Sequence, residues 1–415
     1  MSNKIYPIGI QNFEKIRQDG YFYVDKTALM YQMVKTGSYY FLSRPRRFGK
    51  SLLISTLEAY FQGKKELFTG LMVEKLEKDW IEHPILHLDL NIEKYDALES
   101  LDNILDKSLT AWEKLYGAEP SERSFSLRFA GIIERACQKT GQRVVILVDE
   151  YDKPMLQAIG NEDLQKQFRD TLKPFYGALK TMDGCIKFAL LTGVTKFGKV
   201  SVFSDLNNLK DISMDERFVD ICGITEKEIH DNLEEELHQL AEKQKMSYEQ
   251  VCAELKECYD GYHFMEHTIG IYNPFSLLNT FDKMKFGSYW FETGTPTYLV
   301  NLLKKHHYDL ERMAHEETDE QVLNSIDSES SNPIPVIYQS GYLTIKGYDE
   351  EFGIYRLGFP NREVEEGFVR FLLPYYANVN KVESPFEIQK FVREVRSGDY
   401  NSFFRRLQRD RKSVV

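Results

Sequence analysis

One segment restricts the folds open to this chain more than any other. A short apolar run at Tyr39–Ser43 leads into a basic loop at Arg44–Ser51, and apolar residues then recur at helical spacing over Ser51–Phe61. A strand, a loop and a helix in this order are the setting of a phosphate-binding loop. The segment therefore predicts an α/β fold in which this strand belongs to a parallel sheet.

The loop reads Arg-Pro-Arg-Arg-Phe-Gly-Lys-Ser, close to the standard pattern G-x-x-x-x-G-K-[ST]. In that pattern backbone N–H groups surround the phosphates, the lysine neutralises their charge and the hydroxyl binds Mg²⁺. Arg44 stands at the first glycine position, where glycine would allow positive φ or a close backbone approach. The alternative is a basic surface turn, but the flanking strand and helix favour phosphate binding. The residues predicted to hold the nucleotide are Arg46, Arg47, Phe48, Gly49, Lys50 and Ser51.

A second motif has two carboxylates at the end of an apolar strand. Arg143–Val148 is read as a strand covered on both faces, and Asp149 and Glu150 follow it. The aspartate can hold Mg²⁺ together with Ser51, and the glutamate can orient or deprotonate the attacking water. The alternative is a strand that simply ends in a charged turn. Because side chains alternate along a strand, the two carboxylates should point in different directions.

Further strands are predicted at Ile85–Leu90, Cys185–Thr192 and, more briefly, Phe218–Cys222. A glutamate directly after the aspartate is typical of phosphate-loop enzymes in which another strand lies between the loop strand and the acidic strand. We expect Cys185–Thr192 in that place. Thr192 would then sense the γ-phosphate or position water, the alternative being a threonine that only ends a strand.

Three arginines are candidates for neutralising charge that develops on the γ-phosphoryl group: Arg46, Arg47 and Arg217. The alternative for each is an ordinary solvated or structurally paired arginine. Arg217 joins Glu150 and Thr192 in the predicted catalytic set.

The remaining chain predicts helices and a small β-containing module. Helices are expected at Leu101–Tyr116, Phe125–Gln138 and Asp163–Leu179, with Pro174 as a kink or break. Thr225–Glu228 is a capping-box pattern that opens a charged helical stretch, and Pro335–Phe359 contains short β-type runs. We predict a core over 1–223, a helical lid over 224–305, a mixed helical and β module over 306–375, and a connecting region over 376–415.

Composition narrows the class of partners. The net charge of −11 argues against sequence-independent nucleic-acid binding, and the five cysteines show no zinc-ligand spacing. The N-terminus lacks an apolar signal region, and no apolar run is long enough for a membrane span. A cytoplasmic, bacterial location without membrane contact is expected.

Several motifs together resemble the predicted AAA-ATPase-like family of bacterial proteins, and the resemblance extends over nearly the whole chain. The motifs that carry it are Phe22–Thr27, Ser43–Ser51, Asp149–Asp152, Leu191–Val194, Phe203–Leu209, Tyr259–Phe264, Asn273–Ser276, Trp290–Pro296, Tyr338–Thr344 and Phe359–Val364. The resemblance implies a P-loop ATPase core followed by a helical lid, with ATP and Mg²⁺ as ligands. It gives the metal to Asp149 and makes Arg44 the family's own variation on the loop.

Family members commonly continue into a restriction-endonuclease-like nuclease domain. The carboxylate and E-x-K signature of that domain is expected to be missing here, because the chain stops within the connecting region. Nucleic acid is therefore expected as a partner only through that missing region. The residues Asp410–Val415 resemble a translated sequencing adapter, the alternative being an ordinary basic tail.

The sequence thus favours a Mg²⁺-dependent ATPase that switches or drives an attached or partner module, with a protein partner or oligomer expected. One alternative is an ATP-binding switch with negligible turnover. Another is a DNA-processing or defence protein whose nuclease domain is missing. The motifs Tyr259–Phe264 and Trp290–Pro296 are expected to shape lid packing, because their aromatic and glycine content suits tight turns over a core.

Overall fold

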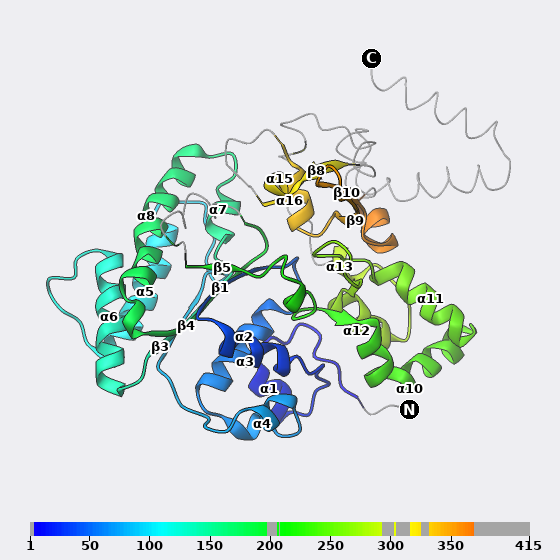
Figure 1. Cartoon of the computed structure of the whole chain (residues 1–415), viewed down its shortest axis with the longest axis horizontal. Coiled ribbons are helices and arrows are strands. Elements are labelled where there is room, and N and C mark those ends of the chain that lie inside the picture. The colour runs from blue at the N-terminus through cyan, green and yellow to red at the C-terminus, as the bar shows by residue number, and fades with distance from the viewer. Residues whose placement is uncertain are drawn as a thin grey trace, which may run out of the picture. The chain divides into compact units, whose positions relative to one another are not determined.

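A parallel sheet organises the N-terminal half of the chain (Figure 1). The computed structural model describes residues 4–196, 206, 208–292, 303, 316–324 and 332–368. Its contacts divide the chain into two compact units, residues 1–363 and 364–415. The elements that follow belong to the first unit. The predicted boundaries at 223, 305 and 375 stay predictions, and residues 376–415 lie outside the described part.

Within the described residues, the main sheet has five strands in the order β2-β3-β4-β1-β5, and every neighbouring pair is parallel. The strand β4 therefore lies between the loop strand β1 and the acidic strand β3, as the sequence predicted. The expected strand at Phe218–Cys222 is wrong. That segment begins in a single 3-10 turn, and the fifth strand pairs with β1 just before it. The strands are β1 Tyr39–Ser43, β2 Ile85–Asp89, β3 Val144–Asp149, β4 Ile186–Gly193 and β5 Lys210–Asp211.

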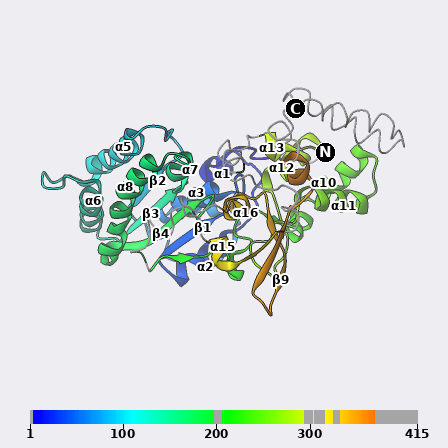
Figure 2. The same ribbon diagram turned by 90° about the horizontal axis from the view of Figure 1, so that it is seen from above.

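Helices cover both faces of this sheet. Figure 2 shows α5, α6 and α8 beside the strands β2, β3 and β4. Alternate residues of the inner strands, such as Phe41 and Ile146, belong to the apolar cluster that also contains residues of these three helices. On the opposite face Phe61 of α3 packs against Phe188 of β4, with ring centroids 5.4 Å apart. The fully apolar strands thus result from burial on two sides. The helices of this region are α1 Phe13–Gln18, α2 Thr27–Thr36, α3 Lys50–Phe61, α4 Met72–Leu76, α5 Glu99–Tyr116, α6 Phe125–Thr140, α7 Lys153–Gln157 and α8 Glu162–Thr181.

Pro174 does not split its helix, because α8 runs continuously over 20 residues with the proline inside. The amphipathic spacing on either side outweighs the lost backbone hydrogen bond, since α8 buries Phe168, Leu172 and Phe175 in the core cluster.

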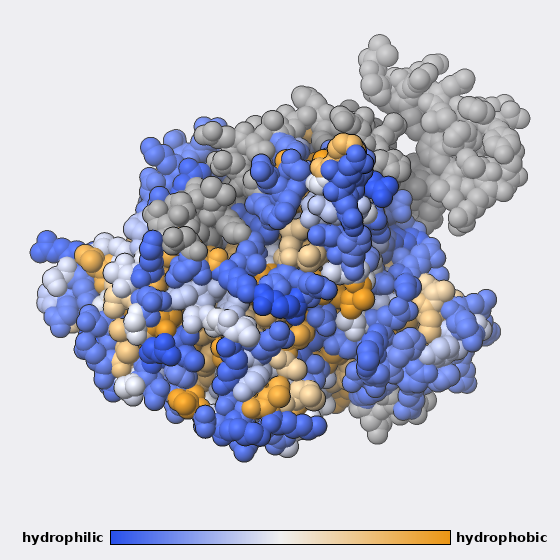
Figure 3. Space-filling model, in the orientation of Figure 1, coloured by the Kyte–Doolittle hydropathy of each residue, from blue (hydrophilic) through white to orange (hydrophobic). Residues whose placement is uncertain are grey.

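A helical region follows the sheet and has its own apolar cluster. It opens as predicted at the capping box of Thr225 and Glu228, where side chain and backbone bond each other reciprocally. Two short strands of this region, β6 and β7, pair in antiparallel orientation. On the face shown in Figure 3 hydrophilic residues cover much of this region, as expected for amphipathic helices at a surface. Its elements are β6 Ile224–Thr225, α10 Glu226–Gln244, α11 Tyr248–Tyr259, β7 Ile271–Tyr272, α12 Pro274–Lys283 and α13 Tyr289–Glu292.

The small β-containing module is present as an antiparallel sheet of order β8-β10-β9. The first of the β-type runs, Ile337–Ile345, was predicted only partly correctly, because its start lies in the helix α16 and only its end enters β9. Within the described residues, none of the helices combines the length and apolarity that a membrane span requires. The module contains β8 Glu317–Asp319, α15 Glu320–Asn324, α16 Ile334–Gln339, β9 Thr344–Asp349 and β10 Ile354–Gly358.

Candidate functional site

The loop between β1 and α3 has the backbone form of an anion-binding turn. Arg47 and Gly49 have φ angles of 66° and 96°, in the left-handed region. Gly49 is the N-cap of α3, and no side chain caps the helix start. The N–H groups of the first helical turn have no intrahelical acceptors, so this helix end can bind the charge of a phosphate.

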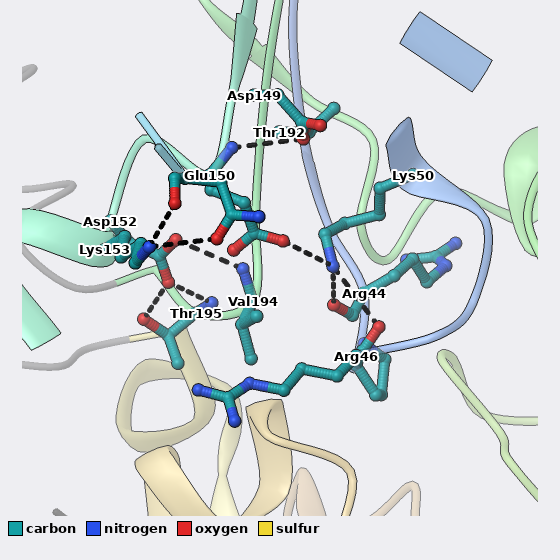
Figure 4. A network of polar contacts seen from close by, with 12 residues as sticks. Arg44, Arg46, Lys50, Asp149, Glu150, Asp152, Lys153, Thr192, Val194 and Thr195 are labelled. Carbon is teal, nitrogen blue, oxygen red and sulfur yellow. Dashed lines mark hydrogen bonds and ion pairs between the residues drawn. The ribbon is translucent and has the colours of Figure 1, made fainter. Parts of the chain in front are cut away.

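Lys50 is the first residue of α3, and its side chain, which reaches back to the start of the loop, is only 4% exposed. Its ammonium group donates to the carbonyls of Arg44 at 3.1 Å and Pro45 at 3.3 Å, and lies 3.5 Å from Glu150 Oε1 (Figure 4). A buried ammonium needs such partners, because desolvation penalises its charge. The lysine is therefore held where phosphate oxygens could replace its present acceptors.

Arg44 explains why the first glycine of the standard pattern can be absent. Its side chain is 1% exposed and donates to the carbonyls of Ser43, Ser213, Phe218 and Val219 at 2.8 to 3.4 Å. Its φ angle is not positive, so the position does not require glycine. The arginine instead ties the start of the loop to the segment after β5.

The two carboxylates after β3 point apart, as predicted, although for a different reason. Asp149 Oδ1 accepts from Thr192 Oγ1 at 2.6 Å and from the Glu150 N–H at 3.1 Å. The strand ends at Asp149, and Glu150 has a left-handed φ of 55°, which directs its carboxylate toward Lys50 (Figure 4). The turn at Glu150, rather than the alternation of side chains along the strand, makes the two carboxylates point in different directions.

The end of β4 is fastened to the acidic motif through Asp152, which sequence reasoning did not single out. This carboxylate is fully buried and accepts from the Val194 and Thr195 N–H groups and from Thr195 Oγ1 at 2.6 to 3.2 Å. A Cβ on Gly193 would lie 2.5 Å from Asp152 Oδ1, so only glycine admits this approach. Burial, and then the charge of Glu150, raises the pKa of Asp152 from 3.8 to about 6.

A cavity of about 380 Å³ opens along the loop and the strand ends. This volume lies within the roughly 300–1,000 Å³ typical of ligand sites. The N-terminal segment 7–11, the phosphate loop, α7 and α12 form its walls. Of the predicted residues, those that line it are Arg46, Arg47, Gly49, Lys50, Ser51 and Glu150.

The other predicted residues lie elsewhere. The Phe48 side chain packs on Tyr262, with ring centroids 4.7 Å apart, and lines the smaller cavity described below rather than this one. The Thr192 hydroxyl donates a hydrogen bond to the Asp149 carboxylate, and neither residue lines the cavity. Arg217 has a side chain 46% exposed that pairs with Asp215, and it is not among the lining residues.

Polar residues missed by the sequence analysis also line the cavity: Asn91, Lys153 and Gln157. Lys153 Nζ donates to the Asn91 carbonyl and side chain at 2.5 and 3.0 Å. Burial lowers the pKa of Lys153. The one available signal was position, because Asn91 follows β2 and so lies at the carboxyl edge of the sheet, where ligands of α/β proteins bind.

A smaller, apolar cavity of about 100 Å³ adjoins the first and shares Gly49, Leu52 and Pro274 with it. Its other walls include Val24 and Ile224. The shared walls make it an apolar extension beside the start of α3.

The oxygen donors of the site suit Mg²⁺. The Ser51 hydroxyl lies at the start of α3, and the Asp149 carboxylate is 5% exposed at the end of β3. Among the described residues, no three His, Cys, Asp or Glu side chains form a group that could hold a metal. Mg²⁺ is usually held by one or two carboxylates together with substrate phosphates, which this donor set allows.

Comparison with known proteins agrees with the geometry. Residues 7–203 match the model of a family described as predicted AAA-ATPase. A curated relative is named as an uncharacterized protein in the vnfD 5′ region of Azotobacter chroococcum mcd 1. It is 39% identical over 381 residues, covering 91% of this chain and 71% of the relative.

Proposed function

The chain belongs to the predicted AAA-ATPase family, and from this we propose that it binds ATP with Mg²⁺ and hydrolyses it to switch or drive an attached or partner module. Membership of the family implies nucleotide binding. The observation that carries the finer proposal is the approach of Lys50 Nζ and Glu150 Oε1 to 3.5 Å at the cavity. A phosphate-binding cation and a candidate base thereby face the same space.

The triphosphate lies along the loop in this proposal. The uncapped start of α3 and the ammonium group of Lys50 bind the phosphate oxygens, while Arg46 and Arg47 add positive charge at the cavity wall. The adenine lies against the apolar surface shared by the two cavities, where Leu52, Pro274 and Leu278 meet. ATP would thus contact both the sheet region and α12.

Ser51 and Asp149 hold Mg²⁺, which supplies charge neutralisation at the phosphates when bound. Glu150 orients a water molecule and accepts its proton as the water attacks the γ-phosphorus. The bond from that phosphorus to the bridging oxygen breaks, and ADP and phosphate leave. Thr192 fixes the Asp149 carboxylate through their 2.6 Å hydrogen bond.

The Lys50 ammonium group has three donor hydrogens, so it cannot bind phosphate oxygens and also keep all three of its present acceptors. When phosphate oxygens attract its ammonium group, its pairing with Glu150 weakens, and the glutamate becomes available to water. In this proposal, nucleotide binding therefore also releases Glu150 to act as the base.

Phosphate release tests the enzyme against the non-hydrolysing switch. We expect Glu150→Gln to keep ATP binding and to lower turnover about a hundredfold or more, the scale of general-base catalysis. Glu162→Gln, the same change at an exposed position in the first turn of α8, is the matched control and should turn over like the wild type. Wild-type turnover in Glu150→Gln would remove this residue from the mechanism. Tight ATP binding without turnover in the wild type would favour the switch.

A further inference from the structure

The phosphate loop is supported from outside by residues that follow the family match in the chain. That match ends at residue 203. Phe48 packs on Tyr262 and Phe264, with centroid distances of 4.7 and 5.6 Å, and the Arg44 guanidinium lies 4.0 Å from the Phe264 ring centre. A Cβ on Gly341 would come within 2.6 Å of Pro45. The loop therefore rests against the helical region and the β module.

Trp290 makes the most specific of these contacts. Its side chain is 5% exposed, and its indole Nε1 donates to the Arg46 carbonyl at 3.1 Å. The ring packs against Tyr342 at a centroid distance of 5.2 Å, and the Trp290 backbone N–H donates to Glu363 Oε1 at 2.8 Å. These contacts fix the position of the indole N–H group that donates to the loop.

The Arg46 carbonyl is where such a bond has most effect. The next residue, Arg47, has a φ of 66°, a left-handed conformation that is unfavourable for a non-glycine residue. A backbone in that conformation persists only where its surroundings hold it. Next along the loop, the Phe48 carbonyl accepts from the Gly223 N–H at 3.1 Å. With both carbonyls engaged by outside donors, the intervening backbone is held in the turn that precedes α3.

We propose that Trp290 is a positioning residue of the nucleotide site, which fixes the phosphate loop through the hydrogen bond from its indole N–H to the Arg46 carbonyl. The effect on ATP rests on the proposed function, whereas the effect on the loop does not. Residues beyond the family match thereby complete the site, so the helical region and the β module belong to the nucleotide-binding machinery. The motif at Trp290 then has a role beyond packing.

Limited trypsin digestion of the full chain tests the loop directly, because Arg46 and Arg47 are exposed cleavage positions. Trp290→Phe keeps an aromatic ring and removes the N–H donor. We expect cleavage after these arginines to become several-fold faster without nucleotide, and ATP binding to weaken about tenfold, the effect of one net hydrogen bond. Trp112→Phe is the matched control, because Trp112 is similarly buried, at 8% exposed, within the α5 cluster. It should leave both quantities unchanged.

The outcomes separate the two claims. Loop cleavage and ATP affinity equal to the wild type in Trp290→Phe would overturn the positioning role and leave the proposed function intact. Faster cleavage in a protein whose wild type binds no ATP would support the loop contact and overturn the ATP site. Should Trp290→Phe fail to fold, a Trp80→Phe, Trp112→Phe double variant leaves Trp290 as the sole tryptophan. Its emission should change when ATP binds, and an unchanged emission with ATP bound would contradict the proposal.

Discussion

At the scale of single residues, the site depends on how buried charges are partnered. Lys50 and Arg44 are almost fully buried, yet each finds several oxygen acceptors within 3.5 Å. The acceptors of Arg44 are all backbone carbonyls from its own turn and the segment after β5. Those of Lys50 include a side-chain carboxylate, that of Glu150. The first residue is therefore structural and the second can exchange partners.

Restoring the standard glycine tests this distinction. We expect Arg44→Gly to lower the free energy of unfolding by roughly 3 kcal/mol, because buried carbonyls lose a charged donor. It should not tighten ATP binding, although it brings the loop closer to the standard pattern. Denaturant unfolding and nucleotide titration measure the two effects.

Arg217→Gly is the control for this change. Its side chain is 46% exposed and pairs at the surface with Asp215, so the loss should stay below about 1 kcal/mol. Equal stability of Arg44→Gly and the wild type would contradict the structural role given to Arg44.

The sequence analysis found residues of this site only where they belong to a recognisable motif. Lys50, Ser51 and Glu150, which the motifs name, line the cavity, and their roles toward a nucleotide stay predictions. Lys153 and Asn91 were not found, because nothing in their local sequence distinguishes them from surface residues. Their proximity arises only when β2 and β3 align in the sheet.

At the scale of elements, the place of one strand was predictable because a chemical motif implied it. An acidic pair at the end of β3 required an intervening strand, and β4 occupies that place. Short elements were less predictable. The predicted β-type run Ile337–Ile345 begins inside the helix α16, since the residues there are buried by tertiary contacts that override local preference. The polar segment Ser325–Asn332, expected to be a linker or exposed loop, lies outside the described part of the chain except for Asn332.

The link between β3 and β4 predicts a pH dependence. The folded pKa of Asp152, about 6, exceeds the ordinary value of 3.8. Between these values the folded protein keeps a proton that the unfolded chain has lost, so the free energy of unfolding falls as pH rises from about 4 to about 6. The loss amounts to roughly 3 kcal/mol and stays constant at higher pH.

Asp152→Asn removes this titration and should flatten the change with pH over the same range, measured by denaturant unfolding without nucleotide or Mg²⁺. Asp163→Asn, at an exposed position of α8, is the control and should retain the wild-type slope. The same slope in Asp152→Asn as in the wild type would show that another group titrates.

At the scale of the whole described unit, the nucleotide cavity joins parts that are far apart in sequence. The N-terminal segment 7–11, the phosphate loop, α7 and α12 all contribute to its walls. Trp290 and Gly341 support the loop from still later positions. The fold class and the phosphate loop were evident from the sequence. The packing of these later segments against the loop was not, because it depends on tertiary contacts between segments that no local pattern connects.

Such a shared site predicts that ATP stabilises the whole unit. At a free ATP concentration a hundred times the dissociation constant, the free energy of unfolding should rise by about 2.7 kcal/mol. The helical region and the sheet region should gain hydrogen-exchange protection together. Protection confined to the loop and β3 would contradict a site that includes α12.

The central claim is that the loop at Arg44–Ser51 binds the phosphates of ATP, and calorimetric titration with MgATP tests it most directly. The wild type should bind with defined stoichiometry, and Lys50→Ala should weaken binding about a hundredfold or more, because it removes charge-assisted bonds to phosphate. Lys227→Ala removes the same charge from a side chain 82% exposed on α10 and should bind like the wild type. Equal affinity of Lys50→Ala and the wild type for ATP would contradict the assignment of this loop.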